Sequence, residues 1–215
     1  MKSSKQLIPI FTAVVMLIAA EARAAKVDMK DPRRALGRED DIRVDVQLFQ
    51  DQISSSTPLN VTYQIQNLTT VPIAIADKVV SVSYDQDERT IMLSIGAEIP
   101  ADTMPHVVVI PPGMKKTLTA GGVFNVAVAN NRFAAAPQYV QVRVNVLRDL
   151  TAFRDLIARS SESAAPIPLP NALFDTWLDA NDTILCNSIP VRWNGSGSKD
   201  KLPTAEQRMP AVGTW

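Results

Sequence analysis

Apolar and polar residues alternate along residues 59–66, which is the pattern of a β-strand with one buried face and one exposed face. The apolar positions are Leu59, Val61, Tyr63 and Ile65. A period of two places all four side chains on the same face of the strand. Short polar residues at 67–70 favour a turn, and the apolar run at 72–75 predicts a second strand. Two half-buried strands joined by a polar turn indicate an antiparallel sheet.

The same alternation recurs over residues 42–48 and 139–147, so each segment predicts a further strand. In the second segment, we expect Arg143 on the exposed face, because its valine neighbours share the opposite face. The valines expected to face the core are Val140, Val142, Val144 and Val146. Other apolar runs that predict strands are 79–84, 90–95 and 107–110.

Turn-forming residues separate these strands. The charged segment 85–89 predicts a hairpin loop, and Pro111-Pro112-Gly113 predicts a tight turn. Gly121 and Gly122 indicate a bend or bulge in a strand. This spacing of short strands over residues 42–147 predicts an all-β fold, an antiparallel sandwich of about seven strands. A barrel with the same number of strands is the alternative.

The period changes after residue 147 and predicts a short C-terminal helical extension. Apolar residues first follow a helical spacing, a proline-rich strip follows at 166–170, and a second short helix carries Trp177. Residues 183–193 predict a last extended segment. We expect this extension to pack on the sandwich, because an exposed apolar stripe favours aggregation. In the alternative, the extension is free and its tryptophans bind a partner.

The first 24 residues have the features of a secretory signal peptide. A basic start is followed by an apolar run at 7–20 and by the small-residue cleavage site Ala22-Arg23-Ala24. An uncleaved anchor helix is the alternative. We therefore expect an exported protein, periplasmic or secreted, with no later segment long enough to span a bilayer. The predicted divisions are 1–24 signal peptide, 25–40 flexible leader, 41–148 sandwich, 149–193 helix and extended segment, and 194–215 loose tail.

Charge and side-chain chemistry argue against several classes of function. The chain has 22 Lys and Arg and 22 Asp and Glu, so it lacks the basic surplus that nucleic-acid binding requires. It has one histidine, His106, and one cysteine, Cys186, too few for a closed zinc site. We predict no catalytic residue, no cofactor and no metal site, and therefore no enzyme. Cys186 is expected to be a small buried hydrophobic residue, with pairing to another chain or thiol chemistry as the alternatives.

Three features are candidates for binding a partner: the open sheet edges, the loops at the sandwich ends, and the C-terminal extension. Acidic residues crowd the predicted hairpin loop, where a weak calcium site is the alternative to a solvated turn. The residues proposed for partner binding are Asp85, Asp87, Glu88, Arg89, Trp177 and Trp193.

Residues 59–77 and 107–113 carry a resemblance to known modules. The alternating strand ends at Asn67, a short polar turn leads to Pro72-Ile73-Ala74-Ile75, and Ile110-Pro111-Pro112-Gly113 precedes the next strand. Over residues 42–147 the chain resembles a bacterial immunoglobulin-like β-sandwich module and is similar to the domain family named after intracellular proteinase inhibitors.

The resemblance implies an immunoglobulin-like sandwich. With the signal peptide, it favours a non-enzymatic protein-binding or structural module of the cell envelope, whose partner is another envelope or exported protein. A protease inhibitor with the same fold is the alternative, and an enzyme is the third possibility.

Overall fold

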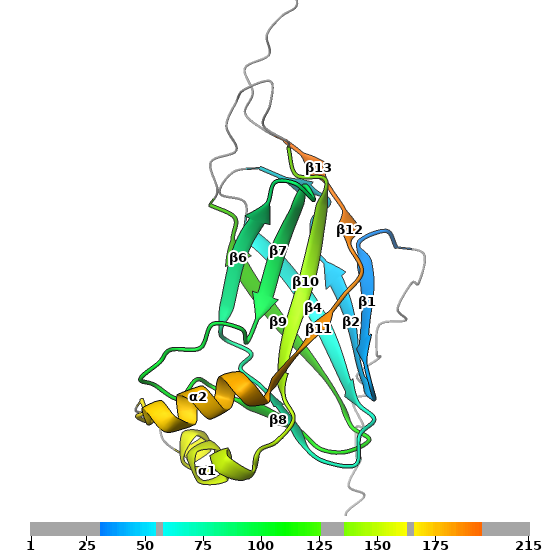
Figure 1. The fold of residues 1–215 in the computed structure, drawn as a ribbon. Coiled ribbons are helices and arrows are strands. Elements are labelled where there is room, and N and C mark those ends of the chain that lie inside the picture. The colour runs from blue at the N-terminus through cyan, green and yellow to red at the C-terminus, as the bar shows by residue number, and fades with distance from the viewer. Residues whose placement is uncertain (1–30, 55–57, 126–135, 163–165, 195–215) are drawn as a thin grey trace, which may run out of the picture.

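The computed structural model describes residues 31–54, 58–125, 136–162 and 166–194. The predicted signal peptide, residues 25–30 of the predicted leader and the tail beyond residue 194 lie outside these ranges. The described part consists mostly of β-strands, which confirms the all-β class (Figure 1). Most strands pair antiparallel, as predicted, but β7 with β10 and β3 with β13 pair parallel.

A four-stranded antiparallel sheet forms one layer. Its strands follow the order β1 (Arg34–Glu39), β2 (Ile42–Leu48), β4 (Pro58–Asn67) and β9 (Lys115–Val123). The alternation predicted for β4 is confirmed, since its four apolar side chains are fully buried. The register between β4 and β9 is unbroken from Pro58 opposite Val123 to Gln66 opposite Lys115.

The second layer is a seven-stranded sheet built around β10 (Tyr139–Leu147), the most central strand of this layer. Strand β7 (Thr90–Ile95) runs parallel to β10, and its neighbour β6 (Val80–Asp85) completes the predicted hairpin. At the other end of the order lie β5 (Ile73–Ile75) and β8 (Val108–Ile110), which pair antiparallel. On the side away from β7, β10 pairs with β11 (Asn181–Leu185) and β12 (Ile189–Pro190). A small separate sheet joins β3 (Gln52–Ile53) to β13 (Arg192–Trp193).

Side chains from both layers form the larger of two apolar clusters among the described residues; the second lies around Phe153 and Trp177. The valines predicted to face inward from β10 are all fully buried, and Arg143 between them is exposed, as expected. They pack in one cluster with the inward residues of β2, β4 and β7. The core therefore lies between the two sheets.

The predicted leader is shorter than expected, because residues 34–39 form β1 rather than a flexible segment. Ala35 and Gly37 lie opposite Val46 and Val44 of β2, and Ala35 is buried. The inward positions of this strand carry an alanine and a glycine, so the sequence shows no apolar alternation. The absence of a side chain at Gly37 is needed, since a Cβ there would lie 2.9 Å from the Cys186 Sγ atom.

The prediction of a bend or bulge at Gly121 and Gly122 is wrong, because both residues lie within the regular β4–β9 ladder. A Cβ atom at Gly122 would lie 2.5 Å from Cγ2 of Val82 on β6. The glycine therefore allows the edge strands of the two sheets to approach each other closely.

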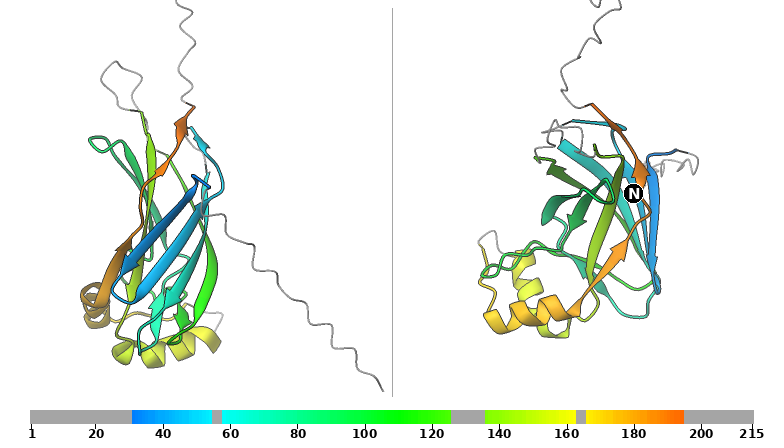
Figure 2. Two further views of the ribbon diagram at one scale, coloured as in Figure 1. Left: turned by 90° about the vertical axis from the view of Figure 1, so that its right-hand side faces the viewer. Right: turned by 45° about the horizontal axis from the view of Figure 1, so that its top comes forward.

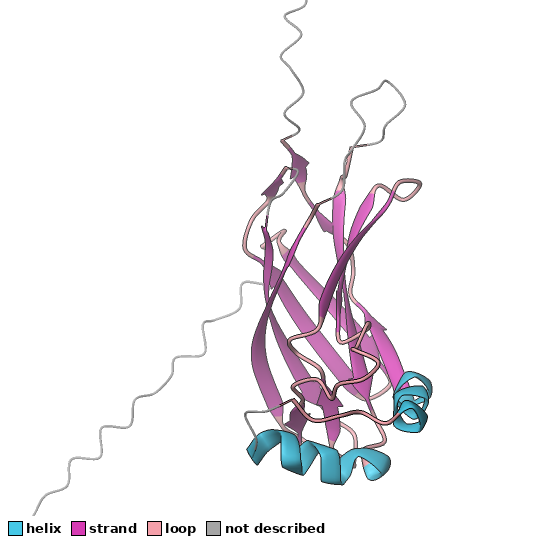
Figure 3. Ribbon diagram, turned by 90° about the vertical axis from the view of Figure 1, so that its left-hand side faces the viewer, coloured by secondary structure: helices cyan, strands magenta, loops and turns pink. Residues whose placement is uncertain are grey.

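The C-terminal extension packs on the β-layers, as predicted. The short 3₁₀ turn η1 (Thr151–Phe153) leads into α1 (Arg154–Glu162), and α2 (Asn171–Ala180) follows. Both helices lie at the same end of the molecule (Figures 2 and 3). The indole of Trp177 is only 1% exposed and meets the ring of Phe153 edge to face at 5.2 Å. From α2 the chain continues directly into β11, which covers the side of β10 that would otherwise be an open edge.

The turn after β4 is organised by Asn67, whose side chain is fully buried. Its Nδ2 donates to the carbonyl oxygens of Val71 and Ile110, both at 2.9 Å. Its Oδ1 accepts from the backbone N–H of Thr69 at 3.0 Å and from the hydroxyl of Thr69 at 2.7 Å. One side chain therefore joins the β4–β5 turn to β8.

We expect Asn67→Ala to lower the free energy of unfolding by about 2–3 kcal/mol, because it removes every hydrogen bond of a fully buried side chain, including the buried one to the Ile110 carbonyl. The matched control is Thr70→Ala in the same turn, where the side chain is exposed and a change below about 0.5 kcal/mol is expected. Urea denaturation of both variants measures the difference. Equal shifts for the two variants would contradict the role given to Asn67.

Candidate functional site

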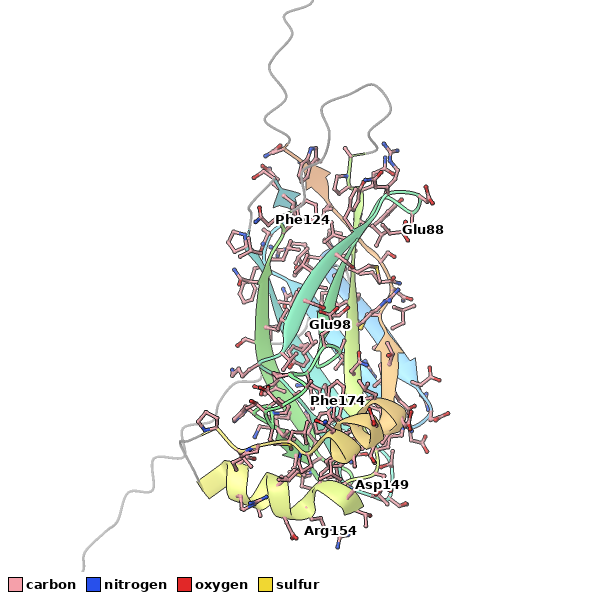
Figure 4. All side chains as sticks on the ribbon, turned by 60° about the vertical axis from the view of Figure 1, so that its left-hand side comes forward. Glu88, Glu98, Phe124, Asp149, Arg154 and Phe174 are labelled. Atoms are coloured by element: carbon pink, nitrogen blue, oxygen red, sulfur yellow. The ribbon has the colours of Figure 1, made fainter. Side chains whose placement is uncertain are left out.

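The charged residues predicted for partner binding lie at the β6–β7 hairpin tip. Figure 4 places Glu88 at the end of the molecule opposite Arg154 of α1. Oδ1 of Asp85 accepts from the backbone N–H groups of Asp87 and Glu88, at 3.0 and 3.1 Å. Arg89 has a φ of 52°, and its carbonyl oxygen accepts from the N–H of Gln138 at 2.8 Å. Asp85 therefore stabilises the turn itself.

Two of the predicted binding residues are tryptophans that take part in packing. Trp177 is buried against Phe153, where it fixes α2 on the sheets, and its indole is therefore covered by the fold itself. Trp193 is half-buried and meets the ring of Phe124 edge to face, with ring centroids 5.7 Å apart.

Cys186 is buried, as predicted, with its Sγ atom against Gly37 of β1. Burial, with a smaller contribution from the charge of Asp45, raises the pKa of the thiol to about 12. A protonated, enclosed thiol is a poor nucleophile.

His106 is exposed but has a buried partner that the sequence reasoning did not single out. Its Nδ1 lies 2.6 Å from Oδ1 of Asp77, whose side chain is only 4% exposed. The Nζ atom of Lys78 lies 3.4 Å from the other carboxylate oxygen. Strand pairing explains this contact. Ile75 of β5 lies opposite Val108 of β8, so Asp77, two residues after Ile75, lies opposite His106, two residues before Val108. The only signal in the sequence was a carboxylate at the end of an apolar run.

Asp77 lies close enough to Tyr63 of β4 for its charge to act on the phenol. Burial and, to a smaller extent, the negative charge of Asp77 raise the pKa of the Tyr63 hydroxyl. Asp77 also lines a groove of about 520 Å³ that lies on the β6–β9 side of the molecule. The residues around this groove are Phe49, Asn60, Val61, Asp77, Lys78, Val80, Thr119, Ala120 and Gly121.

Strand β9 borders this groove and is paired only on its β4 side within the described ranges. The N–H of Phe49 donates to the carbonyl of Asn60, so the backbone groups of Asn60 face β2. In an antiparallel ladder, successive residues of a strand direct their backbone groups to opposite sides. The even-numbered residues of β4 therefore bond β2, and the β9 residues opposite them turn their backbone groups away from β4. Those outward-facing residues are Lys115, Thr117, Thr119, Gly121 and Val123. Within the described ranges, no strand pairs with their outward N–H and C=O groups along this edge.

A second hollow, of about 600 Å³, lies between α1 and the β5–β8 end of the sheet. Arg148 lines it, but its guanidinium already pairs with Asp40, at 3.2 Å, and with Asp182. This arginine joins the β1–β2 turn to β11, so its charge serves the fold rather than a ligand.

Comparisons with protein-family models, curated proteins and solved structures found no match for this chain. Among the described residues, no group of three or more His, Cys, Asp or Glu side chains is arranged to hold a metal ion. In the same ranges, no helix has the length and apolar character needed to cross a membrane.

Proposed function

We propose that this protein is an exported, non-enzymatic protein-binding module of the cell envelope. Its two facing sheets are proposed to form an immunoglobulin-like sandwich, and its N-terminal segment is proposed to direct export. The partner is another envelope or exported protein. The observation that carries the proposal is the edge of β9 that no described strand pairs with; β9 is nine residues long and has a groove beside it.

An edge of this kind binds an extended segment by strand addition. The outward N–H and C=O groups of β9 supply main-chain hydrogen bonds, and a neighbouring groove supplies side-chain selectivity. The other candidates fit this role less well. The side of β10 is covered by β11, and the carboxylate of Asp85 at the hairpin tip bonds its own turn. The buried, protonated Cys186 thiol favours binding over cysteine chemistry.

Proline at position 117 tests the proposal. Thr117→Pro removes an outward N–H group that β4 does not use, so we expect the fold to persist and partner binding to be lost. Thr117→Val is the matched control, because it changes the side chain and keeps the N–H group. Binding is measured in the envelope fraction of cells through a photo-crosslinking amino acid at position 119.

The expected result is a discrete crosslinked product from position 119 that Thr117→Val retains and Thr117→Pro loses, with both variants folded. A crosslinker at Asp175 on α2 controls for chance encounters, since this side chain is exposed outside the edge. A product that survives Thr117→Pro, or that forms equally well from position 175, would refute binding through β9.

A further inference from the structure

We propose that the groove beside β9 receives an arginine side chain of the bound segment, with its guanidinium on the carboxylate of Asp77. This inference rests on the proposed function, because it specifies which residue type the edge-bound segment presents. It names a binding site for a cationic side chain, at a carboxylate that the fold already holds in place.

The first observation is the state of Asp77. Its side chain is 4% exposed, and it nevertheless lines the groove. A buried carboxylate is costly unless it is well paired. The imidazole of His106 lies at 2.6 Å from one oxygen, whereas the partner that the described residues offer the other oxygen is the Nζ atom of Lys78 at 3.4 Å.

Lys78 is a replaceable partner for this second oxygen. Its side chain is 66% exposed, so its ammonium is largely solvated. An arginine arriving from the groove brings a planar set of donors that matches a carboxylate, and a guanidinium is more weakly hydrated than an ammonium. Exchange of Lys78 for such a guest returns the lysine to water and gives Asp77 a stronger ion pair.

The rest of the groove suits the stem of an arginine. Val61, Val80 and Ala120 provide apolar lining along which its methylene groups can lie while the charged end reaches Asp77. A segment added along β9 directs alternate side chains to the same face of the sheet as Ala120. The alternation of the added strand therefore delivers a side chain to this groove.

Besides His106 and Lys78, which already contact the carboxylate, two lysines of β9 bear on a basic guest. Lys115 and Lys116 at the start of β9 are the cations of the strand that oppose a basic guest. The groove is lined by Thr119, Ala120 and Gly121, so its nearest residue is three positions beyond Lys116, or about 10 Å along a strand. That separation is about one Debye length at moderate salt, which weakens the repulsion. An acidic guest would instead meet the buried carboxylate directly.

The test uses short fluorescent peptides that alternate valine and threonine around one central residue, which is arginine or citrulline. Citrulline keeps the shape of arginine and removes its charge. We expect the arginine peptide to bind wild-type protein about tenfold more tightly than the citrulline peptide, the scale of one charge-assisted hydrogen bond. Asp77→Asn should abolish this preference, and Asp175→Asn on α2 should preserve it.

The outcomes separate this inference from the proposed function. Equal binding of the arginine and citrulline peptides, still sensitive to Thr117→Pro, would overturn the arginine site and leave edge binding standing. A crosslinked product from position 119 that is unchanged when the Asp77→Asn protein folds in cells would also overturn the arginine site and leave edge binding standing. If no peptide binds, the arginine site is likewise overturned. If Asp77→Asn does not fold, the comparison of arginine with citrulline on the wild-type protein decides the question.

Discussion

Replacing Val144 by aspartate is expected to lower the free energy of unfolding by about 4 kcal/mol or more, the scale for an unpaired charge in a core. Val144 lies at the centre of β10 and is fully buried. Its neighbours across the two ladders are Ile95 of β7 and Ile184 of β11. No described side chain at these positions can pair with a carboxylate.

Arg143→Asp is the matched control, one residue away on the opposite face of the same strand. Arg143 is exposed, so a change below about 1 kcal/mol is expected. Urea denaturation of the two variants beside the wild type measures the difference. Urea unfolding transitions displaced by equal amounts in the two variants would show that the register of β10 is wrong, because a period of two cannot bury both positions.

The alternation of residue types was sufficient to predict β4 and β10, since each strand buries a continuous row of apolar side chains. It could not reveal β1, whose inward positions hold Ala35 and Gly37. Nor could it show that β7 and β10 run parallel, because periodicity describes the faces of a strand and not its neighbours. Strand order follows from packing between segments that are distant in sequence.

The candidate site was harder to foresee for a related reason. Asp77 and His106 are 29 residues apart and meet only because β5 and β8 pair in one particular register. The two glycines of β9 predict a bend or bulge, and that prediction is wrong, because the close approach of Val82 to Gly122 arises only when both sheets are in place. In each case the missing information was the relative position of two elements.

The C-terminal extension determines which edge of the fold is left for a partner. Strand β11 pairs with residues Arg143 to Leu147 of β10, and Cys186 beyond it forms an isolated bridge with Gly37 of β1. The C-terminal extension therefore covers one side of the molecule, where β11 lies between β10 and β1 (Figure 1). The described strand β9 retains a free edge on the other side.

Truncation after Pro170 is therefore expected to destroy the cooperative fold or to cause aggregation. It removes α2 together with β11, β12 and β13, and it uncovers the hydrogen-bonding edge of β10. It also exposes Phe153, which packs on Trp177. An uncovered edge beside apolar side chains promotes association between chains. Thermal denaturation followed by circular dichroism, with light scattering, measures both effects.

A pair of point variants on α2 separates packing from the loss of chain. Trp177→Ala should cost about 3–5 kcal/mol, the range for removing a large buried aromatic side chain. Leu178→Ala, at a neighbouring position that is 48% exposed, should cost less than about 1 kcal/mol. If the truncated protein stays monomeric with an unchanged melting temperature, the extension contributes nothing to the fold. Equal effects of the two substitutions would instead show that α2 rests on the sheets through a different face, and that Trp177 is available to a partner after all.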